Sequence, residues 1–154
     1  MKKVRFKQIA YCTDFSDHAN EAFWTARDLA ERYEATLHIV HVIGMSSVPM
    51  DGPFIPMEQE VNFFEKASQA AQASVAEHYV SKLDKRRLHF VHVLSGYPAT
   101  EIVALAKKEK IDLIVMGSHG LTGIAHVFFG STADRVVRRA SCSVMTVRFP
   151  GGKG

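Results

Sequence analysis

The chain has 154 residues, of which 47% are hydrophobic, and its 19 basic and 16 acidic residues leave a formal net charge of +3. This size and apolar content indicate one folded domain spanning residues 1–154 and exclude a disordered chain. The charges are spread without a long block of one sign, so the sequence does not indicate a nucleic-acid-binding face.

The sequence shows no signal for export or membrane insertion. No apolar run approaches the roughly 18 residues that a membrane-spanning helix needs, and the first residues lack the apolar region and cleavage site of a signal peptide. We therefore expect a cytoplasmic protein without a membrane partner. Cys12 and Cys142 have no metal-ligand spacing, so free thiols are expected.

Hydrophobic periodicity predicts alternating strands and helices along the whole chain. Short apolar runs are typical of buried strands, and apolar residues at three- and four-residue steps predict helices. The predicted elements are strand 7–12, helix 17–33, strand 36–44, helix 57–83, strand 87–96, helix 98–109, strand 112–117, helix 131–140 and strand 143–149. Ser16 is placed to cap the first helix, and Pro98 suits the first turn of the third. Prolines and glycines break residues 44–56 into a loop that we expect to be mobile.

This order of elements predicts a Rossmann-like α/β fold with a parallel sheet and helices on both faces, because parallel neighbours need right-handed crossovers. Ligands bind such sheets beyond the carboxyl ends of the strands. Thr13 and Asp14 follow the first predicted strand, Val42 lies near the end of the second, and Gly117 ends the fourth. We expect these residues to share one rim of the sheet.

The connection from Gly117 to Thr132, GSHGLTGIAHVFFGST, is long for an α/β domain and contains four glycines. Main-chain N–H groups at a helix start, preceded by glycines, form an anion site. Ser131 is placed to cap the following helix, with Asp134 positioned as in a capping box, and the Ser131 and Thr132 hydroxyls can donate to a phosphate. The alternative is that the glycines only make turns and Ser131 is only a cap. A P-loop is excluded, because the connection has no lysine.

The spacing of Gly117, Gly120, Gly130 and Ser131 reproduces the signature G-x2-G-x9-G-[ST] of nucleotide-binding universal stress proteins, and the resemblance covers nearly the whole chain. It implies a five-stranded sheet in the order 3-2-1-4-5, binding of ATP or AMP, and a homodimer made by pairing of fifth strands. The chain departs from the family at Cys12, where many members have proline. This departure affects only the shape of the wall beside the adenine.

The resemblance also implies roles for the rim residues. Asp14 and Val42 resemble positions that meet adenine and ribose, and Met116 lies near the ribose and the first phosphate. The glycines and hydroxyls of the long connection resemble the phosphate cradle. The expected nucleotide-binding residues are Thr13, Asp14, Val42, Met116, Gly117, Gly120, Gly130, Ser131 and Thr132.

Two functions remain open for this site. The first is a dimeric sensor or regulator in a stress response, with little or no turnover. The second is a slow ATPase or a nucleotide-transferring enzyme. Phosphoryl transfer depends on placed charges, yet the connection lacks a lysine and the chain shows no obvious carboxylate pair for a metal. We therefore assign no catalytic or metal-binding residue, and expect any Mg²⁺ to be held mainly by the phosphates.

Histidines suggest one further kind of site. The near copies LHIVHV and LHFVHV place two histidines in each of two strands that the family order makes neighbours. Residues three apart on a strand point to opposite faces, so neither pair chelates within its own strand. A cross-strand pair such as His41 with His92 stays open as a metal site, and hydrogen-bonded sheet histidines are the simpler interpretation. His119 and His126 in the glycine connection are alternatives for a phosphate contact or a general base.

Overall fold

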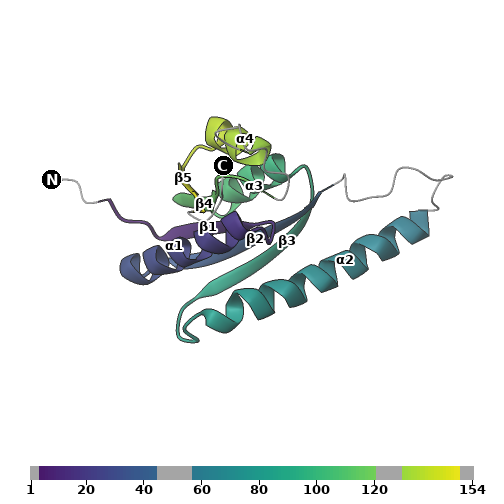
Figure 1. Ribbon diagram of the computed structural model, residues 1–154, viewed down its shortest axis with the longest axis horizontal. Helices are drawn as coiled ribbons and strands as arrows, with labels where there is room; N and C mark the ends of the chain where they lie inside the picture. Colours follow the sequence, from purple (N-terminus) through teal and green to yellow (C-terminus); the bar gives the residue numbers. More distant parts are fainter. Residues whose placement is uncertain (1–3, 45–56, 121–129, 150–154) are drawn as a thin grey trace.

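A five-stranded parallel sheet forms the centre of the computed structural model, which describes residues 4–44, 57–120 and 130–149 (Figure 1). The strands are β1 (Gln8–Thr13), β2 (Thr36–Gly44), β3 (His89–Gly96), β4 (Leu113–Gly117) and β5 (Ser143–Val147). The helices are α1 (Asp17–Tyr33), α2 (Met57–His78), the 3-10 turn η2 (Val80–Lys82), α3 (Pro98–Lys108) and α4 (Ser131–Arg139). The strand order is β3-β2-β1-β4-β5, which confirms the expected fold class.

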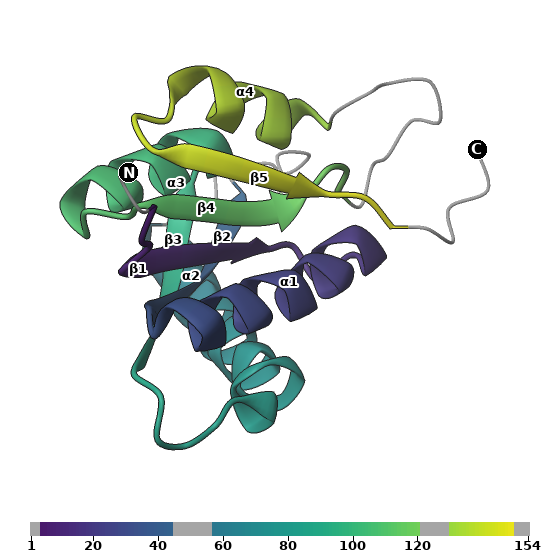
Figure 2. The same cartoon turned by 90° about the vertical axis from the view of Figure 1, so that its left-hand side faces the viewer.

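Helices cover both faces of the sheet, with α1 and α2 on one face and α3 and α4 on the other (Figure 2). The central strand β1 is buried at five of its six positions. Side-chain alternation sends Ile9 and Tyr11 toward α1 and α2, and sends Ala10 and Cys12 toward α3 and α4. A parallel sheet covered on both faces needs apolar residues at consecutive positions, which explains the unbroken apolar run in β1.

The first helix approaches the sheet closely because small residues form its buried face. Ala19, Ala22, Ala26 and Ala30 recur along α1, and each is exposed by 6% or less. The Ser16 hydroxyl accepts a hydrogen bond from the Ala19 N–H at 3.3 Å, so Ser16 is the cap that the sequence predicts. This cap places the first turn of α1 directly beside the end of β1.

The predicted helix 57–83 is wrong in its last turn. α2 stops at His78, and Tyr79 leaves helical geometry with φ −124° and ψ −55° before the 3-10 turn η2. The Tyr79 side chain is 2% exposed, and its hydroxyl contacts Thr13 and Asn20 in the interior. Tyr79 continues the apolar spacing of α2, so this spacing alone does not show that the helix ends at His78.

Two predicted connections fall largely outside the described residues. They are the loop 44–56 beyond position 44 and the centre of the glycine connection, 121–129, which includes His126. Within the described residues, every helix is too short or too polar to cross a membrane.

The two cysteines are free thiols, as expected. Cys12 is buried in β1, and burial raises the pKa of its thiol to about 12. Cys12 therefore stays protonated at neutral pH and acts as a small apolar residue of the core.

The histidines of β2 and β3 do form a cross-strand pair, but a different one from the pair considered in the sequence. Val40 lies opposite His92 in the ladder, so His92 shares a face with His38 and not with His41. His38 Nδ1 and His92 Nε2 are 2.9 Å apart, and His38 Nε2 lies 2.8 Å from Gln8 Oε1. The described residues contain no group of three or more side chains able to hold a metal. The pair is therefore the hydrogen-bonded sheet contact of the simpler interpretation.

Candidate functional site

The predicted rim lies where the sheet changes its direction of growth. β2 and β3 follow β1 on one side, whereas β4 and β5 lie on the other side, so the change falls between β1 and β4 (Figure 1). Connections that leave in opposite directions open a crevice at the carboxyl ends of such strands. Asp14 follows β1 and Gly117 ends β4, so these two predicted residues flank the crevice.

Asp14 is oriented by the turn that joins β1 to α1. Its Oδ1 accepts a hydrogen bond from the Ser16 N–H at 3.0 Å. Its Oδ2 lies across the crevice against Gly120, where an added Cβ would be 2.5 Å away. Phe15, which lies between Asp14 and Ser16 in the turn, has φ 63°, a value that bulky residues rarely adopt. The Asp14 carboxylate therefore faces the glycine connection.

Close main-chain approach accounts for the glycines at both ends of this connection. A Cβ added to Gly117 would lie 2.8 Å from the carbonyl carbon of His18 in α1. Gly130 donates its N–H to the Ser118 carbonyl at 2.7 Å. A Cβ on Gly130 would lie 3.3 Å from His119 Cα. The two ends of the connection therefore contact each other, and the first of them also contacts α1.

The start of α4 differs from the predicted cap. Gly130 is the N-cap and Ser131 is the first helical residue, because the Gly130 carbonyl accepts the Asp134 N–H at 3.0 Å. The Asp134 carboxylate pairs with Arg138 at 3.0 Å and does not form a capping box. The Ser131 and Thr132 hydroxyls make no hydrogen bond within the described ranges. The first N–H groups of a helix also lack intrahelical acceptors, so these donors together form a candidate anion site.

The main chain of β2 continues past the end of β1. Thr13 pairs with His41, so Val42 lies one position beyond the last pair of these strands. The Thr36 N–H donates to the carbonyl of Lys7, just before β1, so the main-chain groups of Thr36 point toward β1. Main-chain groups alternate in direction along a strand, so those of Val42, six residues later, also point to the β1 side. The Val42 carbonyl therefore faces the space beyond the end of β1.

Met116 and Thr13 lie at the rim, but their side chains point into the core. Met116 is 6% exposed and packs on the α3 side. The Thr13 hydroxyl accepts a hydrogen bond from the Phe15 N–H at 3.0 Å and lies 2.8 Å from the Tyr79 hydroxyl. The Tyr79 hydroxyl donates to Asn20 Oδ1 at 2.7 Å. Tyr79 has one hydroxyl hydrogen, so Thr13 must be the donor to Tyr79. A ligand at this rim would meet the main chain of these two residues.

His18 lies at the rim and was missed in the sequence. Its ring centroid is 5.1 Å from that of His119, and its Nδ1 accepts a hydrogen bond from the Phe149 N–H at 3.3 Å. The available signal was Gly117, because a glycine at a strand end indicates that another segment comes close. Which segment comes close is decided by packing of α1 on the sheet.

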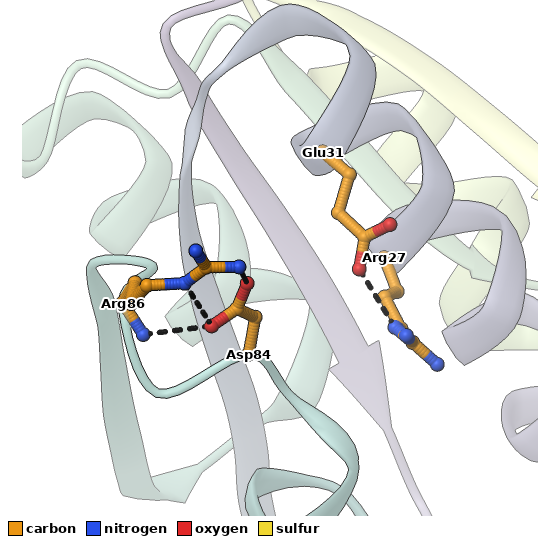
Figure 3. Close-up of polar contacts among 4 residues, drawn as sticks. All are labelled: Arg27, Glu31, Asp84 and Arg86. Atoms are coloured by element: carbon orange, nitrogen blue, oxygen red, sulfur yellow. Dashed lines mark hydrogen bonds and ion pairs between the residues drawn. The ribbon is translucent and has the colours of Figure 1, made fainter.

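A second hollow lies at the amino end of the sheet, between α1 and the connection before β3. Arg27 pairs with Glu31 on α1 at 2.9 Å, and Asp84 pairs with Arg86 on the facing connection at 2.8 Å (Figure 3). The hydrogen bonds from Arg86 lower the pKa of Asp84 to about 2. These four charges compensate each other, whereas Arg87, which also lines the hollow, forms no ion pair within the described ranges. The start of α4 presents several donors that have no partner among the described residues, so the carboxyl rim is the stronger candidate for a ligand site.

Comparison with known proteins identifies related chains over the full fold. A sequence model described as the universal stress protein family matches residues 5–148. The chain is 33% identical to Universal stress protein MJ0531 of Methanocaldococcus jannaschii, over 94% of this chain and 84% of that protein. It also resembles the solved structure of MJ0577 from the same organism, with a TM-score of 0.82 and 26% identity, over 97% of this chain and 100% of the other. A universal stress protein solved in complex with cAMP shares the fold, with a TM-score of 0.58 and 24% identity, over 94% of this chain and 98% of the other.

Proposed function

The chain belongs to the universal stress protein family, and we propose that its carboxyl rim binds an adenine nucleotide, ATP or AMP. In this proposal the protein is a sensor or regulator in a stress response, with little or no turnover. Occupancy by the nucleotide is the signal that it reports.

One observation carries the proposal. Asp14, on the turn after β1, lies against Gly120, and the two ends of the long connection meet where Gly130 donates its N–H to Ser118. These contacts lie at the point where an open α/β sheet binds ligands. The start of α4 adds main-chain and hydroxyl donors that have no partner within the described ranges. A phosphate group is the ligand that this donor set fits best, because it accepts several hydrogen bonds and favours the positive end of a helix.

The other side of the rim suits an adenine base. The Val42 carbonyl faces the space beyond β1 and is suited to accept a hydrogen bond from the exocyclic amine. The Asp14 carboxylate, on the adjacent turn, is suited to accept one from the ribose or the base. The cAMP complex of the distant relative concerns that protein, and it supports the proposal only by showing an adenine nucleotide on this fold.

The test begins with protein purified without added nucleotide. Denaturing it and identifying any released compound by chromatography and mass should yield ATP, ADP or AMP. Protein verified to be empty should then release heat on titration with at least one of these nucleotides. Absence of both results would contradict the proposal.

Turnover separates the sensor from the alternative enzyme. The native chain and a Gly130→Val variant should release labelled phosphate from ATP at the same rate, within the background of the assay. Turnover that depends on Gly130 would favour the slow ATPase. Transfer of the nucleotide or phosphate to an acceptor would favour the transferring enzyme.

A further inference from the structure

Strand β3 is an edge of the sheet, because β2 is its only partner among the strands that the structure describes. Leu37 of β2 donates its N–H to the Leu88 carbonyl at 3.2 Å. The N–H and carbonyl of one strand residue point to the same side, and the side alternates along the strand. The groups that face away from β2 are therefore those of His89, Val91, Val93 and Ser95. None of them has a hydrogen-bond partner among the residues that the structure describes.

Natural proteins usually guard such an edge with a charged residue, a proline, a bulge or a covering helix. Residues 89–96 contain no Asp, Glu, Lys, Arg or Pro. Phe90 is 48% exposed on the α3 side and Val91 is 39% exposed on the α2 side, so neither helix layer covers the amino half of this edge. Leu88, just before the strand, is 62% exposed. Among the described residues the edge is thus uncovered over its amino half, eight residues long, and carries exposed apolar side chains at Phe90 and Val91.

The charges at the amino end of this edge are mainly positive. Residues 84–87 carry three cations and one carboxylate, and residues 107–110 at the end of α3 also carry three cations and one carboxylate. Lys85 and Arg87 form no ion pair within the described ranges. Near His92 in the middle of β3 the charges are mixed: burial is the main cause that lowers the pKa of this imidazole, Glu109 raises it and Lys108 lowers it by less. The excess of positive charge is therefore that of Lys85 and Arg87 before the strand.

We propose that the β3 edge binds an extended segment of another protein, which adds a sixth strand to the sheet and places carboxylates beside residues 84–87. Main-chain hydrogen bonds to the outward groups of β3 supply affinity, and the exposed Leu88, Phe90 and Val91 contact alternating apolar side chains of the segment. The basic residues select acidic segments over basic ones. This site lies on β3, away from the crevice between β1 and β4, and does not depend on nucleotide binding.

A second copy of this chain is a poorer occupant of the same edge. Its own β3 strand carries no carboxylate, and its flanking segments bring the same excess of cations. In a parallel pair the two basic amino ends would meet and repel each other, and in an antiparallel pair each basic end would meet the uncharged Ser95 and Gly96 of the other strand. A segment with a carboxylate cluster meets complementary charge instead.

Proline at position 91 is the sharpest test. Val91→Pro removes one outward N–H and leaves the ladder to β2 intact, because proline is tolerated where the N–H of an edge strand faces solvent. Val91→Thr is the matched control, since it keeps the N–H and the branched shape. The probes are fluorescein-labelled synthetic peptides, EEVTVTVT and its reverse TVTVTVEE, with KKVTVTVT and TVTVTVKK as charge controls. Fluorescence anisotropy at low salt measures their binding to the native chain and to both variants.

We expect at least one glutamate peptide to bind at least tenfold more tightly than its lysine counterpart, and the preferred orientation reports the strand direction. Val91→Pro should weaken that binding at least tenfold, and Val91→Thr should not. If Val91→Pro fails to fold, as judged by circular dichroism, Lys85→Glu with Arg87→Glu should remove the preference for the glutamate peptide. Equal binding of glutamate and lysine peptides, or unchanged binding to a folded Val91→Pro variant, would overturn the proposal. A change from dimer to monomer in Val91→Pro would assign the edge to a second copy and overturn it as well.

Discussion

Gly117 and Gly130 both lie against neighbouring main chain, and Gly117 is the more closely approached of the two. An added Cβ at Gly117 would lie 2.8 Å from the main-chain carbonyl carbon of His18, so the backbone must move. We expect Gly117→Ala to lower the free energy of unfolding by about 1 to 3 kcal/mol, the usual range for overpacking. Urea denaturation followed by circular dichroism measures this loss. Unchanged stability would show that α1 can move away from position 117 without a measurable loss of unfolding free energy.

Gly130 has an ordinary φ of −63°, so a side chain there costs no left-handed strain. A branched side chain would instead occupy the space in front of the α4 donors. Losing two charge-assisted hydrogen bonds of about 1.5 to 3 kcal/mol each would weaken ATP binding by roughly 10²- to 10⁴-fold. Gly130→Val should therefore lose affinity in calorimetry while keeping its circular dichroism spectrum, and Ser131→Ala should show a milder loss. A folded Gly130→Val variant with native affinity would exclude the phosphate cradle.

The His38 and His92 pair makes stability sensitive to acid. Burial is the main cause that lowers the pKa of both imidazoles. The pKa of His38 is lowered further by His92, and the pKa of His92 is lowered further by Lys108. Glu109 raises both pKa values. The folded protein therefore binds protons more weakly than the unfolded chain, whose histidines titrate near pH 6.5. The contribution of the pair is complete above that pH and is lost as the pH falls from about 6.5 toward the lower folded-state pKa values.

The change of unfolding free energy with pH tests this assignment. One proton taken up on unfolding gives a slope of at most about 1.4 kcal/mol per pH unit. We expect the native chain to lose stability as the pH falls below about 6.5, and His92→Gln to show a shallower slope below that pH. Identical slopes for the two proteins would assign the acid sensitivity to other groups.

At the scale of elements, Tyr79 joins β1, α1 and the end of α2 through one hydroxyl group. It lies 2.8 Å from the Thr13 hydroxyl and donates to Asn20 at 2.7 Å. Tyr79→Phe would leave two polar groups without this partner, so we expect a loss of about 1 to 3 kcal/mol in unfolding free energy. Tyr33→Phe is the control, because the Tyr33 hydroxyl makes no hydrogen bond within the described ranges. Equal losses in the two variants would show that the hydrogen bonds of Tyr79 contribute nothing beyond the general cost of removing a tyrosine hydroxyl.

At the scale of the whole molecule, β5 is the second open edge of the sheet. The Ser143 N–H and the Val147 carbonyl both bond toward β4, so alternation turns the main-chain groups of Val144 and Thr146 outward. We expect a homodimer through this edge, with apolar burial by Met145, which is 37% exposed.

Light scattering at micromolar concentration tests the dimer and separates the two edges. Thr146→Pro removes an outward donor of β5 and should shift the protein to a monomer, whereas Thr146→Val keeps that donor and should remain a dimer. Val91→Pro, on the opposite edge, should also remain a dimer. A native chain that is monomeric under these conditions would contradict the expectation.

The sequence by itself determined the alternation of strands and helices and the glycine spacing. Both are local patterns, since burial on a sheet or a helix face repeats along a few neighbouring residues. The family resemblance added the strand order, which the structure confirms. Asp14 and Gly117 were therefore expected on one rim, and the structure places them on either side of the crevice.

Only the tertiary structure decided how distant segments meet. The register of β3 on β2 pairs His92 with His38 and not with His41. Gly130 donates its N–H to the Ser118 carbonyl and is the N-cap of α4, whereas the sequence predicts Ser131 as the cap. Register and close approach depend on residues far apart in the chain, and no periodicity within a single segment records them.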